Sequence, residues 1–338
     1  MTEPVAITGM AVTSAYGRGC AALLSGVLSG RPAFGPVTRF DVSGRRAGVA
    51  ATFSQSPSLR EEVLAVIELA CDEAKLGAAQ RAAAPLFVAA HDRLGFGTAT
   101  YTSACVAAST AVADAASLIA HGDAERVIVA AGYLVEPHQF ALFDAGRALA
   151  VDGAVRPFSK GRKGLLLGDG VAAVVLEARP REPLAWIRGW GRAGDAYHVC
   201  QPRPDGSGLA RAIAAALRRA GVSASDVEYI NAHGSGSQQS DAAEAAALRA
   251  SGLDGVPISS TKSLHGQSLE ASPLVELITT VLAMNSGSLP VNAGHLETDP
   301  ECDVNLILDR PLAASPRHVL VQNSAFGGAN TALLVGAL

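Results

Sequence analysis

Residues 101–121 read YTSACVAASTAVADAASLIAH, and after a short turn residues 126–131 read RVIVAA. The first stretch opens with a cysteine turn and continues over 106–121 with apolar residues on a 3.6-residue period, which predicts a helix. The second is a short apolar run typical of a buried strand, and a similar run at 86–90 precedes the turn. Strand, helix and strand in this order indicate an α/β layered fold, in which crossover helices cover a sheet.

The alternation of strands and helices continues through the chain. The helix predicted at 59–75 has Ser58 as a suitable N-cap. The order of strand, helix, strand, turn and helix occurs once before and once after a stretch rich in Pro and charge at 179–183. We therefore predict two similar α/β halves, 1–180 and 181–338, with a site between them. The other predicted strands and helices are at 5–7, 171–176, 184–190, 208–220, 228–231 and 241–250.

The composition limits the classes of protein to consider. With 338 residues and 49% hydrophobic content, the chain can bury one large core or two smaller ones. A net charge of -4 and the lack of any Lys/Arg-rich run argue against nucleic acid as a partner. The five cysteines are odd in number and widely spaced, so they predict neither a disulfide framework nor a metal site. No basic leader precedes the first apolar run and no apolar stretch reaches ~20 residues, so we expect a cytoplasmic protein that does not bind membranes.

The cysteine turn carries the first candidate for chemistry. Cys105 lies where a β-type run meets a helix of small residues. A thiol at a helix N-terminus sits at the positive end of the helix dipole, which favours the thiolate, and its backbone N–H can bind an oxyanion. A lone cysteine is also often buried and inert, and the turn alone leaves both interpretations open.

A histidine loop carries the second candidate. Residues 231–237 read NAHGSGS and follow a predicted strand. A histidine in a Gly/Ser turn at a strand end is well placed to reach into a cleft, so we predict a functional role for His233. Glu244, on the following helix, is ambiguous, because the helix dipole alone also favours an acidic residue near a helix start.

Five segments have a more specific pattern. They read RPFSKGRKGLLLGDG at 156–170, DAYHVCQPRP at 195–204, NAHGSGS at 231–237, STKS at 260–263 and QNSAFGGAN at 322–330. Together with the cysteine turn, and in the same order, these segments resemble motifs of the β-ketoacyl-acyl carrier protein synthases, the ketosynthases. The resemblance implies the thiolase fold, with two similar α/β halves in a layered αβαβα arrangement. It also implies an acyltransferase of polyketide or fatty-acid biosynthesis.

The resemblance assigns roles to the matching residues. In the family, a cysteine takes an acyl chain from a carrier-protein thioester and is then attacked by a carbanion from malonyl-carrier protein; Cys105 matches that cysteine. The backbone N–H groups of Cys105 and Phe326 match the oxyanion hole, and Phe326 also matches the gatekeeper of the acyl pocket. Gly327 and Gly328 would allow the close backbone approach that this oxyanion hole requires. His233 matches the histidine that holds the malonyl thioester and stabilises its enolate.

One catalytic position departs from the family. Lys262 and Glu244 match a supporting pair that tunes the histidine region. Elongating ketosynthases have a second catalytic histidine five residues after the lysine, in a Gly-His pair, which here reads Gly266-Gln267. The Cys-His-His triad has therefore become Cys-His-Gln. Glutamine can donate a hydrogen bond to a thioester oxygen, as asparagine does in initiating synthases, but it cannot transfer a proton. His265 is a less favoured substitute, because its backbone position differs.

The chain is also shorter than the family pattern. Only residues 91–100 separate the strand at 86–90 from the cysteine turn, where the family has a few dozen residues, and the segment after Phe53 looks trimmed. In the family the missing part supplies much of the dimer interface and part of the acyl tunnel, so we expect both to differ here. The resemblance implies an acyl carrier protein as partner, and a homodimer or a heterodimer with a related ketosynthase subunit. No cofactor or metal is implied, because the acyl groups arrive on phosphopantetheine.

Three alternatives to condensation stay open. Cys105 could pass its acyl group to another nucleophile or to water, since Gln267 replaces a proton-handling histidine. A non-catalytic partner subunit of a ketosynthase heterodimer would typically lack the cysteine, so Cys105 argues against it. A coenzyme-A thiolase would need a second catalytic cysteine in a glycine-rich C-terminal turn, where Cys302 does not lie. Condensation with malonyl-carrier protein is the favoured prediction.

Overall fold

One large sheet organises the molecule. Within the residues that the computed structural model describes, 3–55, 57–180 and 182–338, eleven strands form a mixed sheet in the order β11-β10-β14-β15-β9-β1-β8-β7-β5-β6, with β2 paired to β1. Its strands are β1 (Val5–Ser14), β2 (Gly17–Arg18), β5 (Leu86–Ala89), β6 (Ala99–Tyr101), β7 (Arg126–Tyr133), β8 (Gly170–Glu177), β9 (Ala185–Gly194), β10 (Tyr229–Asn231), β11 (Ile258–Ser259), β14 (His318–Ala325) and β15 (Ala329–Gly336). Two small pairs lie outside it, β3 (Gly35–Pro36) with β4 (Val49–Ala50) and β12 (Ser288–Leu289) with β13 (Leu312–Ala313).

Helices connect most of these strands. The α-helices are α1 (Cys20–Leu28), α2 (Leu59–Glu73), α3 (Ala78–Ala83), α4 (Ala107–His121), α5 (Pro137–Ala145), α6 (Ser207–Ala220), α7 (Gln238–Ala250), α8 (Lys262–His265) and α9 (Ser272–Ser286). Short 3₁₀ turns are η1 (Ala104–Val106), η2 (Ala224–Asp226), η3 (Leu269–Ala271) and η4 (Pro300–Cys302).

The two halves of the sheet have the same internal order. In β1-β8-β7-β5-β6, the first three strands are antiparallel neighbours and the last three are parallel. The series β9-β15-β14-β10-β11 repeats this pattern strand for strand. The halves join where β1 pairs antiparallel with β9. The predicted pair of similar α/β halves is confirmed, while a domain boundary at residue 180 stays a prediction.

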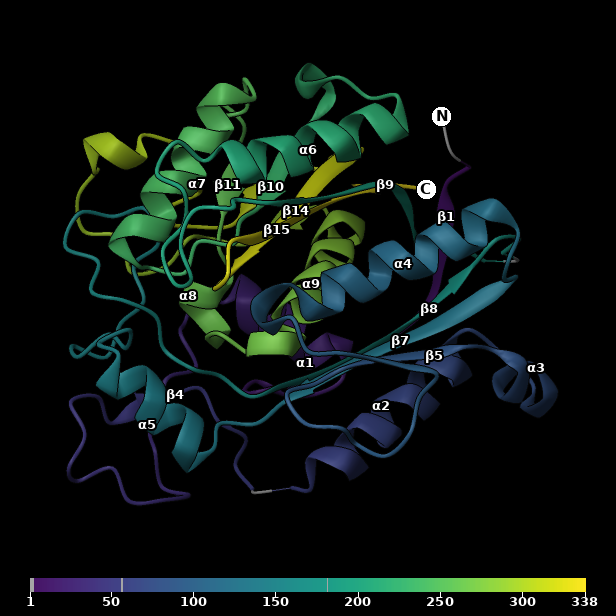
Figure 1. Cartoon of the computed structure of the whole chain (residues 1–338), viewed down its shortest axis with the longest axis horizontal. Coiled ribbons are helices and arrows are strands. Elements are labelled where there is room, and N and C mark those ends of the chain that lie inside the picture. The colour runs from purple at the N-terminus through teal and green to yellow at the C-terminus, as the bar shows by residue number, and fades with distance from the viewer. Residues whose placement is uncertain (1–2, 56, 181) are drawn as a thin grey trace.

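The helices form three layers around the two half-sheets (Figure 1). Helix α2 packs on β1, β7 and β8, and α6 packs on β9 and β15 and against α7. Helices α4 and α9 lie between the half-sheets and contact strands of both. The order of layers is therefore α, β, α, β, α, as predicted.

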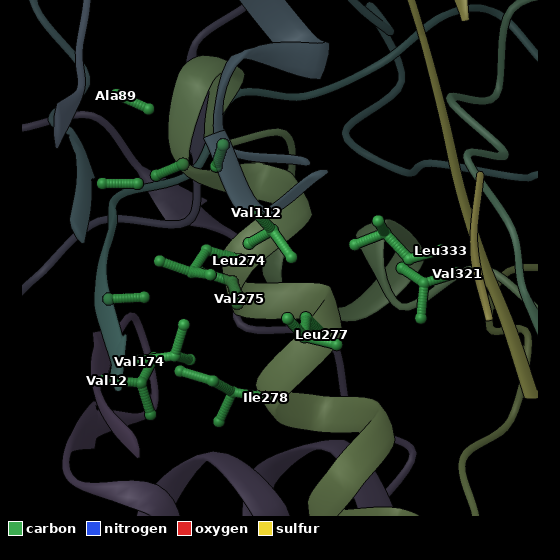
Figure 2. Close-up of a cluster of buried hydrophobic side chains, with 14 of the residues drawn as sticks. Val12, Ala89, Val112, Val174, Leu274, Val275, Leu277, Ile278, Val321 and Leu333 are labelled. Atoms are coloured by element: carbon green, nitrogen blue, oxygen red, sulfur yellow. The ribbon is translucent and has the colours of Figure 1, made fainter. Parts of the chain in front are cut away.

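Helix α9 is the centre of the core. Its apolar residues are buried around the whole helix, which is expected of a helix enclosed by other elements rather than resting on one face of a sheet. Figure 2 shows Leu274, Val275, Leu277 and Ile278 of α9 between side chains of the two half-sheets. These neighbours are Val12 and Val174 on one side and Val321 and Leu333 on the other.

The elements predicted from the sequence are present, most with small differences at their ends, although the strand predicted at 5–7 runs on to Ser14. The helix predicted at 106–121 begins with η1, and the strand predicted at 126–131 runs on to Tyr133. The Ser58 side chain accepts the N–H of Glu61 at 3.5 Å and caps α2 as predicted. Ala104–His121, with 18 residues, is by length and composition alone apolar enough to cross a bilayer. Because 61% of this stretch is buried inside the fold, it reads as a core helix.

Candidate active site

Cys105 lies in the 3₁₀ turn between β6 and α4. The preceding residue, Ala104, has φ 50°, a left-handed conformation that non-glycine residues rarely adopt and that is concentrated at functional turns. The Cys105 side chain is buried, with 6% exposed, and its Sγ accepts a hydrogen bond from Gln267 Nε2 at 2.8 Å. The nucleophile predicted from the sequence thus contacts the residue that departs from the family.

Gln267 is fixed at both its backbone and its side chain. Its N–H donates to Leu166 O at 2.8 Å, and its carbonyl accepts from Gly168 N at 3.0 Å. Gly168 makes this approach possible, because a Cβ there would lie 2.1 Å from His265 O. Ser272 Oγ donates to Gln267 Oε1 at 3.0 Å, which leaves Nε2 to face the thiol. The amide is therefore oriented as a donor toward Sγ.

The backbone around His233 is held in place by two side chains from other segments. Glu244 accepts the N–H of His233 at 2.8 Å and that of Gly234 at 2.7 Å, and Ser260 Oγ donates to Gly234 O at 2.8 Å. Burial, with a further effect from the Lys262 charge, lowers the pKa of His233 well below its usual value. The imidazole is therefore neutral at pH 7, a form that can donate one hydrogen bond and accept another.

Lys262 and Glu244, the two predicted supporting residues, take different partners in the structure. Lys262 forms its ion pair with Glu276 of α9, and both side chains are buried. Glu276 also accepts from Asn323 Nδ2 at 2.6 Å. Glu244 is occupied by the two backbone N–H groups of the histidine loop, and burial raises its pKa to about 8. Glu276 is a functional candidate that the motif reading missed.

His265 does not replace the missing histidine. Its Nδ1 lies 3.0 Å from Gly266 O and its Nε2 lies 3.0 Å from Thr261 Oγ1, so both ring nitrogens have partners outside the cavity. Burial, followed by the Lys262 charge, lowers the pKa of His265 to about 3. Gln267 is thus the residue of this segment that faces Cys105.

A cavity of about 180 Å³ joins the predicted residues. Cys105, His233, Gln267 and Phe326 all line it, although they come from four separate segments of the chain. The Phe326 ring packs against Phe143 with 6.0 Å between ring centroids and is 52% exposed, so it stands at the mouth. This arrangement suits a gatekeeper, while the oxyanion-hole role of the Cys105 and Phe326 N–H groups stays a prediction.

Three further predicted residues, Gly327, Gly328 and Lys262, are not among those that line the cavity. Gly327 has φ 85° and donates its N–H to Val199 O at 2.9 Å, and Gly328 has φ 75°. Lys262 is not among the residues that line the cavity, but its charge lowers the pKa of both Cys105 and His233. Lys262 therefore affects the site through the electrostatic effect of its positive charge.

The electrostatics favour a protonated thiol at rest. Burial, followed by the Glu270 charge, raises the pKa of Cys105 to about 12, although Lys262 and the Gln267 hydrogen bond act in the opposite direction. A thiol of this kind reacts once substrate binding or a proton acceptor stabilises the thiolate.

Comparisons with known proteins agree with this geometry. The model of the β-ketoacyl synthase N-terminal domain matches residues 88–181, and that of the β-ketoacyl synthase C-terminal domain matches residues 184–295. The chain is 32% identical over 418 aligned residues to "Putative polyketide beta-ketoacyl synthase 1" of Streptomyces cyaneus, covering 99% of this chain and 98% of that relative. The chain belongs to the β-ketoacyl synthase family.

Further similar proteins include a relative that matches over part of its length and two solved structures that match over their whole length. The nodulation protein E of Rhizobium meliloti is 37% identical over 243 residues, which cover 69% of this chain and 60% of the relative. Two solved structures match over 100% of both chains with a TM-score of 0.91. They are the ishigamide ketosynthase/chain length factor at 26% identity and a β-ketoacyl synthase of Burkholderia phymatum at 25%. The fold is thus the thiolase fold of the ketosynthases.

Proposed function

We propose that the chain is a ketosynthase-type acyltransferase that loads an acyl group onto Cys105 and condenses it with malonyl-carrier protein. The observation that carries the proposal is the 2.8 Å hydrogen bond from Gln267 Nε2 to Sγ inside a cavity that His233 also lines. A donor in this position stabilises negative charge on sulfur or on a thioester oxygen.

The proposed reaction has two steps. First, the Cys105 thiolate attacks the carrier thioester, a new C–S bond forms, the old one breaks, and the carrier thiol leaves with a proton. Then malonyl-carrier protein loses CO₂, and its enolate carbon attacks the acyl group on Cys105, which releases the thiolate. Decarboxylation needs hydrogen-bond donors to the enolate oxygen and no proton transfer to it, and neutral His233 and Gln267 are such donors.

A second candidate is acyl transfer from Cys105 without condensation. It is favoured by one observation: Gln267 cannot transfer a proton, and burial keeps His233 neutral. Incubation with acyl- and malonyl-carrier protein, followed by CO₂ release and product mass, separates the two. Condensation predicts both CO₂ and an elongated product, and Cys105→Ala is the control without the nucleophile. An acyl adduct that forms without CO₂ would select the second candidate.

The same proposal includes the partners. We propose an acyl carrier protein as substrate carrier, phosphopantetheine-bound acyl groups in place of a resident cofactor, and a homodimer or a heterodimer with a related ketosynthase subunit in the cytoplasm. The similar ishigamide structure is named as a ketosynthase with a chain length factor, which supports the heterodimer. Mixing the purified chain with a candidate partner subunit and measuring mass in solution tests it.

A further inference from the structure

A buried carboxylate lies on the turn η3, which packs on the cysteine turn η1. Glu270 is in the turn η3, three residues after Gln267, and only 2% of it is exposed. Its Oε1 lies 3.5 Å from Nδ1 of the half-exposed His91. Its Oε2 is buried and has no hydrogen-bond partner among the described residues.

A buried hydroxyl accompanies this carboxylate. Tyr133, the last residue of β7, is 2% exposed, and its Oη also has no hydrogen-bond partner in the part of the chain that the structure describes. Turn η3 packs on both β7 and η1, so it brings Glu270 toward Tyr133 and Cys105. The preceding Leu269 has φ 38°, a strained conformation that fixes the direction of the turn.

The charge of Glu270 acts on both of the other groups. The Glu270 charge raises the pKa of Cys105 and of Tyr133, and burial raises the pKa of Glu270 itself. The other charged groups that act on the three are His91 and Asp92 beside Glu270, Lys262 and Glu276 beside Cys105, and Asp169 and Glu136 beside Tyr133.

Buried polar atoms normally have hydrogen-bond partners, and those that lack them mark places where water or a ligand supplies the partner. A carboxylate oxygen accepts only, whereas a phenol both donates and accepts. A ligand hydroxyl placed between them would satisfy both groups, because it would donate to Glu270 and accept from Tyr133. An alkyl chain that displaced water here would leave both oxygens unpaired, which is costly.

We propose that Glu270 and Tyr133 form a polar subsite for the acyl group on Cys105, so that the enzyme selects acyl groups bearing a hydroxyl or amine donor over plain alkyl groups. This inference rests on the proposed acylation of Cys105 and names the class of acyl group that it takes.

The test compares two thioesters of N-acetylcysteamine, 3-hydroxybutyryl and butyryl, which differ by one hydroxyl. The rate of adduct formation on Cys105 is measured by intact mass, with Cys105→Ala as the blank. We expect the wild-type protein to load the hydroxyacyl group about tenfold faster or more, the size of one hydrogen bond to a charged group.

Two variants locate the preference. Tyr133→Phe removes one oxygen and keeps the ring, and Glu270→Met removes the carboxylate at similar volume. Both should lose most of the preference for the hydroxyacyl group. Butyryl loading should rise in Glu270→Met, because the carboxylate no longer opposes the thiolate. A misfolded variant would load neither thioester and is recognised in this way.

The outcomes separate the subsite from the proposed function. Equal loading of both thioesters by the wild-type protein, or a preference that survives in both variants, overturns the subsite and leaves the acylation of Cys105 standing. Failure to load any thioester, including acyl-carrier protein, overturns both.

Discussion

At the scale of single residues, neighbouring groups act in opposite directions on the pKa of the Cys105 thiol. Burial and Glu270 disfavour the thiolate, while Lys262 and the Gln267 side chain favour it. Gln267 is the group in direct contact, and its amide orientation is set by Ser272. Changes at Gln267 should therefore act on the reactivity of the sulfur before they act on the fold.

Gln267→Ala should slow acylation of Cys105 about tenfold or more, because a hydrogen bond to an ionised group is worth roughly 1.5–3 kcal/mol. The measurement is the rate of acyl-adduct formation from acyl-carrier protein. Gln267→Glu, which has a similar shape, should be slower still, since a carboxylate cannot donate and adds a like charge beside the thiolate. Unchanged acylation in Gln267→Ala would show that the amide has no part in activating sulfur.

Alkylation of Cys105 by iodoacetamide should rise about tenfold per pH unit between pH 7 and 10, because only the thiolate reacts. The pKa of about 12 lies above this range, so the thiolate fraction grows throughout it. Peptide-level mass spectrometry must follow the reaction, since Cys200 is exposed and reacts as well. A rate that levels off below pH 9 would mean that the site stabilises the thiolate far more than its burial suggests.

At the scale of helices and strands, one ion pair joins helix α8 to helix α9. Lys262 of α8 and Glu276 of α9 are both buried, and α9 is the helix around which the core is built. A buried pair of this kind is costly to break on one side only, because the other charge then stays behind without its partner.

Lys262→Met should therefore destabilise the protein by about 3–5 kcal/mol, and the double change Lys262→Met with Glu276→Gln should recover most of that loss. Denaturant unfolding of the two single variants and the double variant gives the coupling energy. Acylation should stay impaired in the double variant, since the positive charge that favours the thiolate is gone. Additive losses of stability would contradict a direct interaction between the two side chains.

The sequence predicts most elements of the first 250 residues, misses α9, β14 and β15, and predicts contacts between elements poorly. Strands such as β7 and helices such as α4 follow from apolar periodicity, which is a local property. The pairing of Lys262 is set by how α8 packs on α9, and motif spacing led to Glu244 instead. A usable signal existed: Glu276 is a lone carboxylate in the apolar run 274–278, where a charge needs a partner.

Other parts of the site had no local signal at all. Tyr133 reads as the end of an apolar strand, and Glu270 reads as an ordinary residue of a loop. Their proximity depends on η3 packing against β7, which joins positions more than a hundred residues apart. Resemblance to the family implied that Cys105 and Gln267 share one site. The hydrogen bond between them could be found only in the structure.

At the scale of the whole molecule, the two halves share contacts that should make them unfold together. Helices α4 and α9 each contact strands of both half-sheets, and β1 pairs directly with β9 across the junction. A fragment of residues 1–180 would lack α9 and expose the sheet face that this helix covers.

The full chain should accordingly unfold in a single transition, with near- and far-ultraviolet circular dichroism giving the same midpoint. The fragments 1–180 and 181–338, expressed separately, should show no cooperative transition. Two separate transitions in the full chain, or a fragment that folds alone, would show that the halves are independent domains.

The matching strand order of the half-sheets has a consequence for the origin of the site. In one half, the last strand of the series, β6, leads to Cys105 and then to α4; in the other, β11 leads to Gln267 and then to α9. The nucleophile and its hydrogen-bond donor thus occupy corresponding places, 2.8 Å apart. This is the arrangement expected of an ancestral half that was duplicated, after which one copy of the turn came to carry the thiol and the other the amide that donates to it.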